Sequence, residues 1–396
     1  MRSVCVAGAA MTAFGKYLDR GVRSLAEEAV TGALADAGAG IADVGMVFFG
    51  NAASGLVTRQ ECVRGQVALR RLGLAGTPVV NVENACASGS TAVHLAWLAV
   101  ASGQCDVALA VGAEKLTHPD KMVTFKAMES AVDQEELDEI KARIGAEKDG
   151  ASRSMFMDVY ADMTKRYMAR TGATPRDFAQ VAVKNHHAGA LNPKAQYRDE
   201  VTVEQVLGSR PISPPLTLLM CSPIGDGAAA VVLASEEWAR RHGKNAVTLR
   251  ASVLVSGAGD GDVAPGATRA ARKAFEIAGI GPEELHVVEL HDATAPAELF
   301  LYEEIGLCAE GDGPRLLGSG ATALGGRMPV NPSGGLLSKG HPVGATGCAQ
   351  MVELTNQLRD RCGDRQRPGA RVALMENGGG FVGKDVAAAA VMILSR

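Results

Sequence analysis

Aromatic residues make up only 4% of the 396 residues, so large rings contribute little to the core of this chain. Hydrophobic residues still account for 47%, which predicts a globular protein whose core consists of Ala, Val, Leu and Ile. The chain also lacks a dense run of Lys and Arg, and its formal net charge is −4. These features exclude a nucleic-acid-binding protein, because such proteins need a basic surface.

Cysteine and histidine are present but form no regular pattern. Eight cysteines and eight histidines are scattered along the chain, without a C-x-x-C pair. This excludes a zinc site and a disulfide framework, so we expect no bound metal and a location in the reducing cytoplasm. No apolar run is long enough to span a membrane, and we interpret the initial VCVAGAA (residues 4–10) as a buried strand rather than a signal peptide.

Residues 25–52 and 267–293 share one pattern. Each stretch has a helical Ala/Leu period, then an Ala-Gly pair, then a β-rich apolar run. Gly38 and Gly279 stand at the same place in the two copies, and each is expected to end its helix. The chain is therefore predicted to be a duplication, with one half at residues 1–245 and the other at 246–396.

Short apolar runs between the helical segments predict the strands of both halves. Such runs indicate buried strands in a mixed sheet with helical cover, so we predict an α/β protein with five layers, α/β/α/β/α. The predicted strands are 3–9, 47–49, 78–82, 106–112 and 228–234 in the first half, and 247–255, 288–290, 370–376 and 386–394 in the second.

The alternating pattern breaks between about residues 115 and 215. A charge-dense, helical segment at 133–149 is followed by an amphipathic helix around 158–171 and by a polar stretch. We predict that this insertion lies over the first half, as a lid or as a dimer surface.

Cys86 lies between the strand at 78–82 and a helix predicted at about 88–102, among small residues only. The unpaired N–H groups of a helix start lower the pKa of a thiol and can hold an oxyanion. The small neighbours would clear a path for a large substrate. A nucleophilic cysteine and a packed core cysteine are both compatible with this local pattern.

Three further segments carry groups that can move protons. His341 stands on a glycine-rich loop before another helix, where a histidine can act as a general base. His291 ends a strand at the place that Gly50 takes in the first half, and Asp292 after it is expected to cap the following helix. Glu376 ends a strand just before three glycines (378–380). We predict a turn there, whose N–H groups could point at a ligand. Burial at this place would raise the pKa of the Glu376 carboxyl toward that of a useful base.

Together these segments resemble the thiolase superfamily, and specifically the thiolases of the sterol-carrier-protein-2 type. The resemblance covers essentially the whole chain. It is carried by NACASGS (84–90), HDATAPAE (291–298) and NPSGGLLSKGHPVGATG (331–347), and also by residues 184–200 and 221–236.

The resemblance implies a duplicated thiolase fold and a Claisen-type cycle on coenzyme A thioesters, without a permanently bound cofactor. Cys86 would carry the acyl group as a thioester, and His341 would activate it. His291 and His341 would hold the thioester oxygen of the acceptor, and the N–H groups of Cys86 and Gly378 would bind the oxyanion of the acylation step. A homodimer or a dimer of dimers is implied, with the coenzyme A channel in the insertion.

The sequence departs from the family at the second acid/base. The family has a cysteine either in a C-terminal Cys-x-Gly or in His-Asp-Cys-Phe; Glu376 and Ala293 stand at these positions. The chain is thus a condensing enzyme or thiolase with Glu376 as base, or it transfers the acyl group to another acceptor. The second class includes aldolases that bind a small OB-fold partner. A non-catalytic acyl-CoA- or lipid-binding protein is the third alternative.

Overall fold

The computed structural model describes residues 2–145, 153–242, 247–259 and 261–396. One main sheet has the strand order β3-β2-β4-β7-β1-β8-β11-β10-β9. Its first five strands belong to the first half: β1 (Val4–Met11), β2 (Met46–Gly50), β3 (Val79–Val82), β4 (Val107–Glu114) and β7 (Gly227–Ser235). The other four are β8 (Val247–Ser256), β9 (Val287–Glu289), β10 (Val372–Val382) and β11 (Asp385–Ser395).

The two halves have the same topology. β2 pairs with β4 in parallel, as β9 does with β10, and β7 lies antiparallel between β4 and β1, as β11 does between β10 and β8. A parallel bridge from Val288 to Val330 takes the place of the β2–β3 pair. The duplication predicted from the two repeats is therefore confirmed. Gly38 and Gly279 end equivalent helices, at φ of +60° and +65°.

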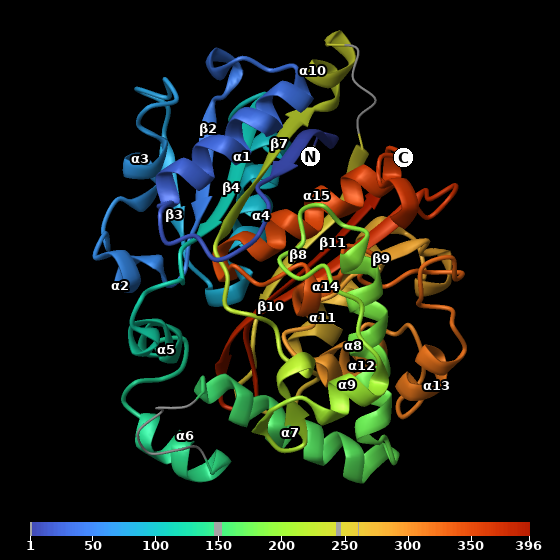
Figure 1. Cartoon of the computed structure of the whole chain (residues 1–396). Coiled ribbons are helices and arrows are strands. Elements are labelled where there is room, and N and C mark those ends of the chain that lie inside the picture. Colours follow the sequence, from blue (N-terminus) through green and yellow to red (C-terminus); the bar gives the residue numbers. More distant parts are fainter. Residues whose placement is uncertain (1, 146–152, 243–246, 260) are drawn as a thin grey trace.

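Helices cover both faces of each half-sheet and complete the five layers (Figure 1). α1 (Val22–Ala37) packs on the outer face of the first half, and α11 (Gly266–Ala278) and α12 (Ala295–Glu304) pack on the outer face of the second. α4 (Ser88–Ala101) and α15 (Thr346–Leu358) form the central layer, where their side chains share one core with strands of both halves. The other helices of the two halves are α2 (Ser54–Thr58), α3 (Arg64–Leu69), α10 (Glu236–Arg241), α13 (Gly313–Gly318) and α14 (Gly335–Ser338).

The insertion forms helices, but its predicted position over the first half is largely wrong. Its elements are α5 (Lys121–Glu129), α6 (Leu137–Ile144), α7 (Met155–Thr171), α8 (Pro175–Ala190), α9 (Val203–Gly208) and a small hairpin, β5 (Pro211–Ser213) with β6 (Leu216–Thr217). Tyr160, Tyr167 and Phe178 of this segment share a core with α11 and α12 of the second half. Among its described helices, α5 packs on the first half, against α2, and the carbonyl oxygen of Lys194 accepts a hydrogen bond from the N–H of Phe14. Apolar side chains of α7 and α8 thus anchor most of the insertion to the second half.

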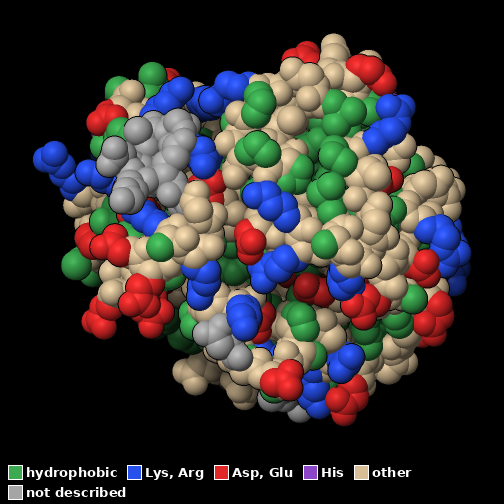
Figure 2. Space-filling model, turned by 90° about the horizontal axis from the view of Figure 1, so that it is seen from below, with side chains coloured by type: hydrophobic (Ala, Val, Ile, Leu, Met, Phe, Trp, Pro, Cys, Tyr) green, Lys and Arg blue, Asp and Glu red, His purple; other side chains and the backbone are tan. Residues whose placement is uncertain are grey.

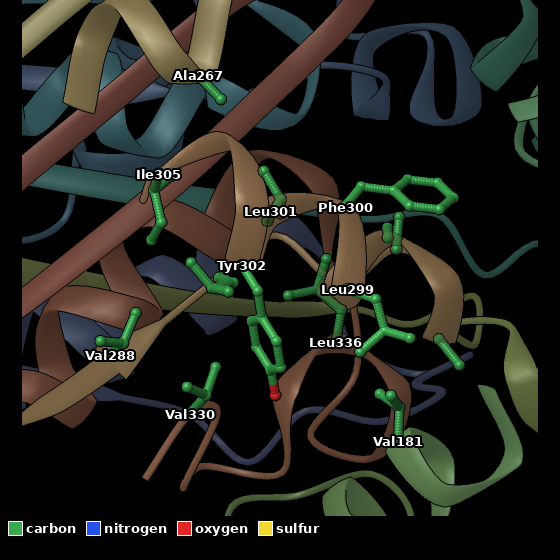
Figure 3. Close-up of a cluster of buried hydrophobic side chains, with 14 of the residues drawn as sticks. Val181, Ala267, Val288, Leu299, Phe300, Leu301, Tyr302, Ile305, Val330 and Leu336 are labelled. Atoms are coloured by element: carbon green, nitrogen blue, oxygen red, sulfur yellow. The ribbon is translucent and has the colours of Figure 1, made fainter. Parts of the chain in front are cut away.

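α12 shows how deeply the second half is packed. Leu299, Phe300, Leu301 and Tyr302 point in different directions from this helix, and all are buried (Figure 3). The phenol of Tyr302 donates a hydrogen bond to Glu298, so its one polar atom is satisfied. α12 is therefore an internal helix. Its packing holds residues 290–294, which connect β9 to α12, in one position.

Charged side chains of both signs share the described surface. Figure 2 shows Lys and Arg side chains interspersed with Asp and Glu side chains on the underside of the molecule. Among the described residues, no helix is both long and apolar enough to cross a bilayer. The predicted boundary after residue 245 falls among residues 243–246, which lie outside the described part of the chain.

Candidate active site

Cys86 lies where the two central helices begin. A 3₁₀ turn (Ala85–Ala87) precedes α4, and an equivalent turn (Val343–Ala345) precedes α15. Cys86 and Gly344 occupy the middle positions of these turns. The sulfur is half-buried and lines a cavity of about 570 Å³ together with His341 and His291. The structure therefore brings together three of the predicted site residues.

His341 is oriented toward the thiol by a specific hydrogen bond. Its Nε2 lies 3.3 Å from the sulfur of Cys86, and its Nδ1 lies 2.7 Å from Oγ1 of Thr346. The hydroxyl of Thr346 donates its own hydrogen to the carbonyl oxygen of Pro342, at 3.2 Å. From this arrangement we infer that Nδ1 donates to Thr346, which leaves Nε2 as the acceptor that faces the thiol.

Burial holds both groups of this pair neutral. Desolvation, with the nearby charge of Glu114, raises the pKa of the Cys86 thiol to about 12, although the N–H groups of Gly380 and Cys86 act in the opposite direction. Burial also lowers the pKa of His341 well below its usual value. The expectation that the helix start yields a resting thiolate is wrong, because desolvation outweighs the helix N-terminus.

His291 completes the polar wall of the cavity. Its ring lies edge-on to that of His341, with 5.1 Å between centroids, and its buried Nε2 has no hydrogen-bond partner in the described structure. Burial lowers the pKa of His291 to about 4, so the ring is neutral and can donate to an oxygen. The sulfur of Cys86 and one nitrogen from each histidine lie within 4.8 Å of one another, a set that could also hold a metal ion.

Glu376 lies beside this cavity but lines a second one. The second cavity has a volume of about 290 Å³, and His291 and Gly378 line both. Oε2 of Glu376 accepts a hydrogen bond from the N–H of His291, at 3.2 Å. Burial is the main cause that raises the pKa of Glu376 to about 8, so most of the carboxyl is protonated at pH 7.

The predicted turn after Glu376 is absent, because β10 continues through the glycines. Gly378 and Gly379 pair with Ala389 and Ala388 of β11, and the chain turns only after Val382. A Cβ on Gly379 would lie 2.2 Å from the carbonyl oxygen of Asn84, so the backbone of β10 must approach the Cys86 turn without side chains. Gly380, with φ of +62°, aims its N–H at the sulfur.

Asp292 does not cap α12, contrary to the sequence-based expectation. Thr294 is the N-cap residue of that helix. The carboxylate of Asp292 instead accepts hydrogen bonds from the N–H of Leu336, at 2.7 Å, and from the side chain of Asn185, at 2.8 Å. It therefore ties the segment that carries His291 to the glycine-rich loop that carries His341 and to α8 of the insertion.

Buried charges fix the loop from 330 to 341. Lys339 and Glu289 form an ion pair of 3.3 Å, and both side chains are almost fully buried. Lys184 of α8 pairs with Glu298 at 2.9 Å, and Glu298 also accepts from Asn331. Breaking such a pair leaves an uncompensated buried charge, so these contacts define one loop conformation.

Glu114 connects the two halves below the site. Its buried carboxylate accepts hydrogen bonds from the N–H groups of Ala52, Ala53 and Ser54 in the first half and of Gly344 in the second. Sequence reasoning missed Glu114 and Thr346, although Thr346 stands in the helix start after His341, where a hydroxyl partner could have been sought.

The rest of the Cys86 cavity is mostly apolar. α5 and α7 contribute Met128, Phe156, Met157 and Tyr160, so the insertion covers the site as a lid. Ala293 lines the same cavity, at the position where the resembling thiolases have a cysteine. The site therefore offers one thiol, two neutral imidazoles and an apolar volume.

Comparisons with known proteins agree with this arrangement. A family model described as the thiolase N-terminal domain matches residues 4–211, and one described as thiolase C-terminal domain-like matches residues 255–396. The acetyl-CoA acetyltransferase of Methanothermobacter thermautotrophicus is 39% identical over 402 residues, covering 100% of both chains. The benzoylsuccinyl-CoA thiolase subunit BbsB of Thauera aromatica is 38% identical, over 96% of this chain and 95% of that protein. Human sterol carrier protein 2 is 36% identical, over 95% of this chain and 70% of that protein.

Solved structures show the same fold. The Ltp2-ChsH2(DUF35) aldolase has a TM-score of 0.79 at 25% identity, with 99% of this chain and 97% of that chain covered. Human mitochondrial 3-ketoacyl-CoA thiolase has a TM-score of 0.74 at 20% identity, with 100% and 98% covered.

Replacing Thr346 by Val tests the orientation of His341. Without the hydroxyl, the tautomer that carries hydrogen on Nε2 becomes populated, and it cannot accept the proton of Cys86. We expect the rate of Cys86 alkylation by iodoacetamide, followed by peptide mass spectrometry, to fall about tenfold, the effect of one lost hydrogen bond. Thr346→Ser keeps the hydroxyl and should react like the wild type; equal rates in all three proteins would contradict the assignment.

Proposed function

The chain belongs to the thiolase family and is an acyltransferase of the thiolase type; we propose that it acts on acyl-CoA through an acyl-thioester on Cys86, in Claisen condensation or in thiolysis of 3-ketoacyl-CoA. The observation that carries this proposal is the contact of 3.3 Å between the thiol and the unprotonated nitrogen of His341. Two relatives of nearly full length, named acetyltransferase and thiolase, favour this proposal over a non-catalytic lipid-binding protein.

In the first step, the sulfur of Cys86 attacks the thioester carbonyl while its proton passes to Nε2 of His341. The S–C bond to coenzyme A then breaks, and His341 returns the proton to the leaving sulfur. The N–H groups of Cys86 and Gly378 would hold the oxyanion between these events. Starting from a neutral pair avoids a buried charge in the resting protein.

In the second step, the N–H of His291 Nε2 would hold the thioester oxygen of the acceptor, and His341 would add a second donor once its Nε2 takes up a proton from solvent. The free and buried Nε2 of His291 supports this role, since a buried donor without a partner is unfavourable until a ligand accepts its hydrogen. Both rings reach the same side of the cavity as Cys86.

Glu376 would take the α-proton of the acceptor in place of the missing cysteine. With a pKa of about 8, the ionised form of this carboxyl is a minor fraction at pH 7, but it is a strong enough base for this proton transfer. The acceptor carbon would have to lie at His291 and Gly378, which line both cavities. Ala293 stands where the His-Asp-Cys-Phe motif has its cysteine, and its methyl group leaves space there but supplies no acid or base.

Coenzyme A would reach Cys86 from a neighbouring cleft of about 510 Å³. This cleft shares Met128, Met157 and His341 with the Cys86 cavity. Its lining includes four basic side chains that could bind the phosphates of coenzyme A: Lys16, Lys121, Arg153 and Arg210.

A carbon–carbon bond enzyme that works with a second protein is the other candidate function. It is favoured by the likeness to the Ltp2-ChsH2(DUF35) aldolase, whose name includes a second component. Such a partner would be the small OB-fold protein expected from the sequence. The intact contact between Cys86 and His341 favours the acyl-thioester route.

A homodimer would form along β3. This strand is the edge of the main sheet, and Val80 on it is 39% exposed. An open edge can pair with the same edge of a second copy. Leu95, Trp97 and Leu98 of α4 are only half-buried and would add apolar area.

Acylation of Cys86 tests the proposal directly. Incubation with acetyl-CoA, followed by acid quenching and mass spectrometry, should add one acyl group to the wild type and none to Cys86→Ala.

Glu376→Gln should acylate normally, but its rate of condensation or thiolysis should fall about 10²–10⁴-fold, the range for loss of a general base. The amide of Gln can still accept from His291, so the loss would report the missing base. If the variant turns over like the wild type, Glu376 is not the base; absence of any adduct would rule out the Cys86 route.

The stability of Glu376→Gln should depend on pH. The carboxyl titrates near 4.5 when unfolded and near 8 when folded, so the unfolded state binds fewer protons between these values, and wild-type stability falls as pH rises. Gln removes this penalty, so we expect the variant to be more stable by roughly 3 kcal/mol at pH 7 and by under about 1 kcal/mol at pH 5. Urea unfolding at both pH values measures the difference. A variant that is equally or less stable at pH 7 would contradict the raised pKa.

Val80→Lys tests the dimer. A charge on the β3 edge should convert dimers into monomers in size-exclusion chromatography with light scattering. Ile277→Lys is the matched control, because Ile277 is 49% exposed on α11, away from this edge. Dimers that survive Val80→Lys at low protein concentration would place the interface elsewhere.

A further inference from the structure

The second cavity, which contains Glu376, lies between α7, α11, α12 and the β10–β11 hairpin. It adjoins the Cys86 cavity, and five residues line both: Tyr160, His291, Gly378, Phe381 and Val386. The rings of Tyr160 and Phe381 meet edge-to-face, with 5.9 Å between centroids. A group bonded to Cys86 could therefore extend past His291 into this cavity, on the side away from the basic cleft proposed for coenzyme A.

The walls of the second cavity suit an aliphatic chain. Met163, Ala297, Phe300 and Leu301 line it along α7 and α12. Each methylene group buried there would favour binding of a longer chain. The cavity volume of about 290 Å³ leaves room for such a chain beyond the thioester itself.

The second cavity continues outward into an open cleft of about 540 Å³. The two share Met163, Pro265, Phe300, Glu304 and Lys384. The underside seen in Figure 2 shows basic and acidic side chains interspersed, and the cleft contains both kinds. The Cys86 cavity, the second cavity and this cleft therefore adjoin in sequence, each sharing lining residues with the next, and we call this sequence the passage.

The cations at the outer end of this passage are not all neutralised. Arg170 is paired with Glu303 and Glu310, and Arg166 with Asp162. Arg272 and Lys384 also line the cleft, both are exposed, and neither has an ion pair with another described residue. Two cations are therefore available at the outer end of an apolar passage.

The cleft also contains the carboxyl groups of Glu303, Glu304 and Glu310, of which Glu303 and Glu310 are paired with Arg170. Burial, with the charges of Asp385 and Glu303, raises the pKa of Glu304 to about 7. Asp385 is held by the N–H groups of Ala258 and Gly266 and lies 3.5 Å from Arg269. A ligand anion at the mouth would meet the guanidinium and ammonium groups first.

We propose that this passage binds the acyl chain of the substrate and that the chain ends in a carboxylate held by Arg272 and Lys384, so that the preferred substrates are coenzyme A thioesters of dicarboxylic acids. This inference rests on the proposed function, because the acyl carbon must be bonded to Cys86. A guanidinium and an ammonium at the end of an apolar channel recognise a carboxylate by charge-assisted hydrogen bonds.

The test compares pairs of coenzyme A thioesters with equal carbon number, one ending in a carboxylate and one in a methyl group, over increasing chain lengths. The readout is kcat/KM for acylation of Cys86. At the length that spans the passage we expect the carboxylate form to be preferred about tenfold or more. Arg272→Gln combined with Lys384→Gln should bring this ratio close to one. Lys273→Gln is the matched control on the same helix, and since Lys273 does not line the cleft the ratio should persist.

Two results would overturn the inference. One is a wild-type ratio near one at every length, which would mean that the passage accepts apolar chains only or none. The other is a preference that the double variant leaves intact. Acetyl-CoA separates this failure from that of the proposed function: an acetyl adduct on Cys86 without a carboxylate preference refutes the dicarboxylate proposal alone, whereas no adduct with any thioester refutes the Cys86 mechanism.

Discussion

The close packing of the starts of α4 and α15 is the constraint on which the site depends. A Cβ on Gly89 would lie 2.7 Å from the carbonyl oxygen of Gly344, and one on Gly347 would lie 2.4 Å from the backbone nitrogen of Ser90. Neither position has room for a side chain, so two helices from opposite halves can begin side by side only with glycine there. This contact places the turn that holds Cys86 next to the loop that holds His341. The small residues around Cys86 are thus explained first by helix packing, and access for a thioester follows from it.

Because the site lies in the central layer, its chemistry is set by burial. The same desolvation that raises the pKa of Cys86 lowers that of His341 and His291, which leaves three neutral groups in contact. Charge then develops only when a substrate oxygen arrives at preorganised N–H donors. The rigid surroundings have a matching cause: the carboxylates of Asp292, Glu114 and Glu289 are all buried, and each accepts hydrogen bonds that hold a loop of the site.

Much of this arrangement could be predicted from sequence, because its signals are local. The repeated helix–glycine–strand pattern gave the duplication, and Cys86, His291 and His341 stand in motifs that mark strand ends and helix starts. Long-range contacts could not be predicted in this way. No local signal shows that α7 packs on the second half or that Asp292 bonds to Leu336 rather than capping its own helix. The glycines after Glu376 look like a turn, but pairing with β11 extends the strand through them, since backbone hydrogen bonds to a long neighbour outweigh the intrinsic preference of glycine.

The position of Glu376 connects the missing cysteines to the second cavity. A cysteine at position 293 would face the Cys86 cavity directly, whereas Glu376 lies behind His291 and Gly378. A carboxyl there can take a proton only from a carbon that lies at this junction, so the acyl-enzyme and the acceptor must meet nearer to the second cavity than they would with a base at position 293. A base at that junction would lie beside the acyl chain that extends from Cys86 into the passage. The residues between the two cavities would then take part both in proton transfer and in selection of the acyl chain. On the proposed mechanism, a base at Glu376 and an acyl chain in the passage would both place the reacting carbon nearer to β10.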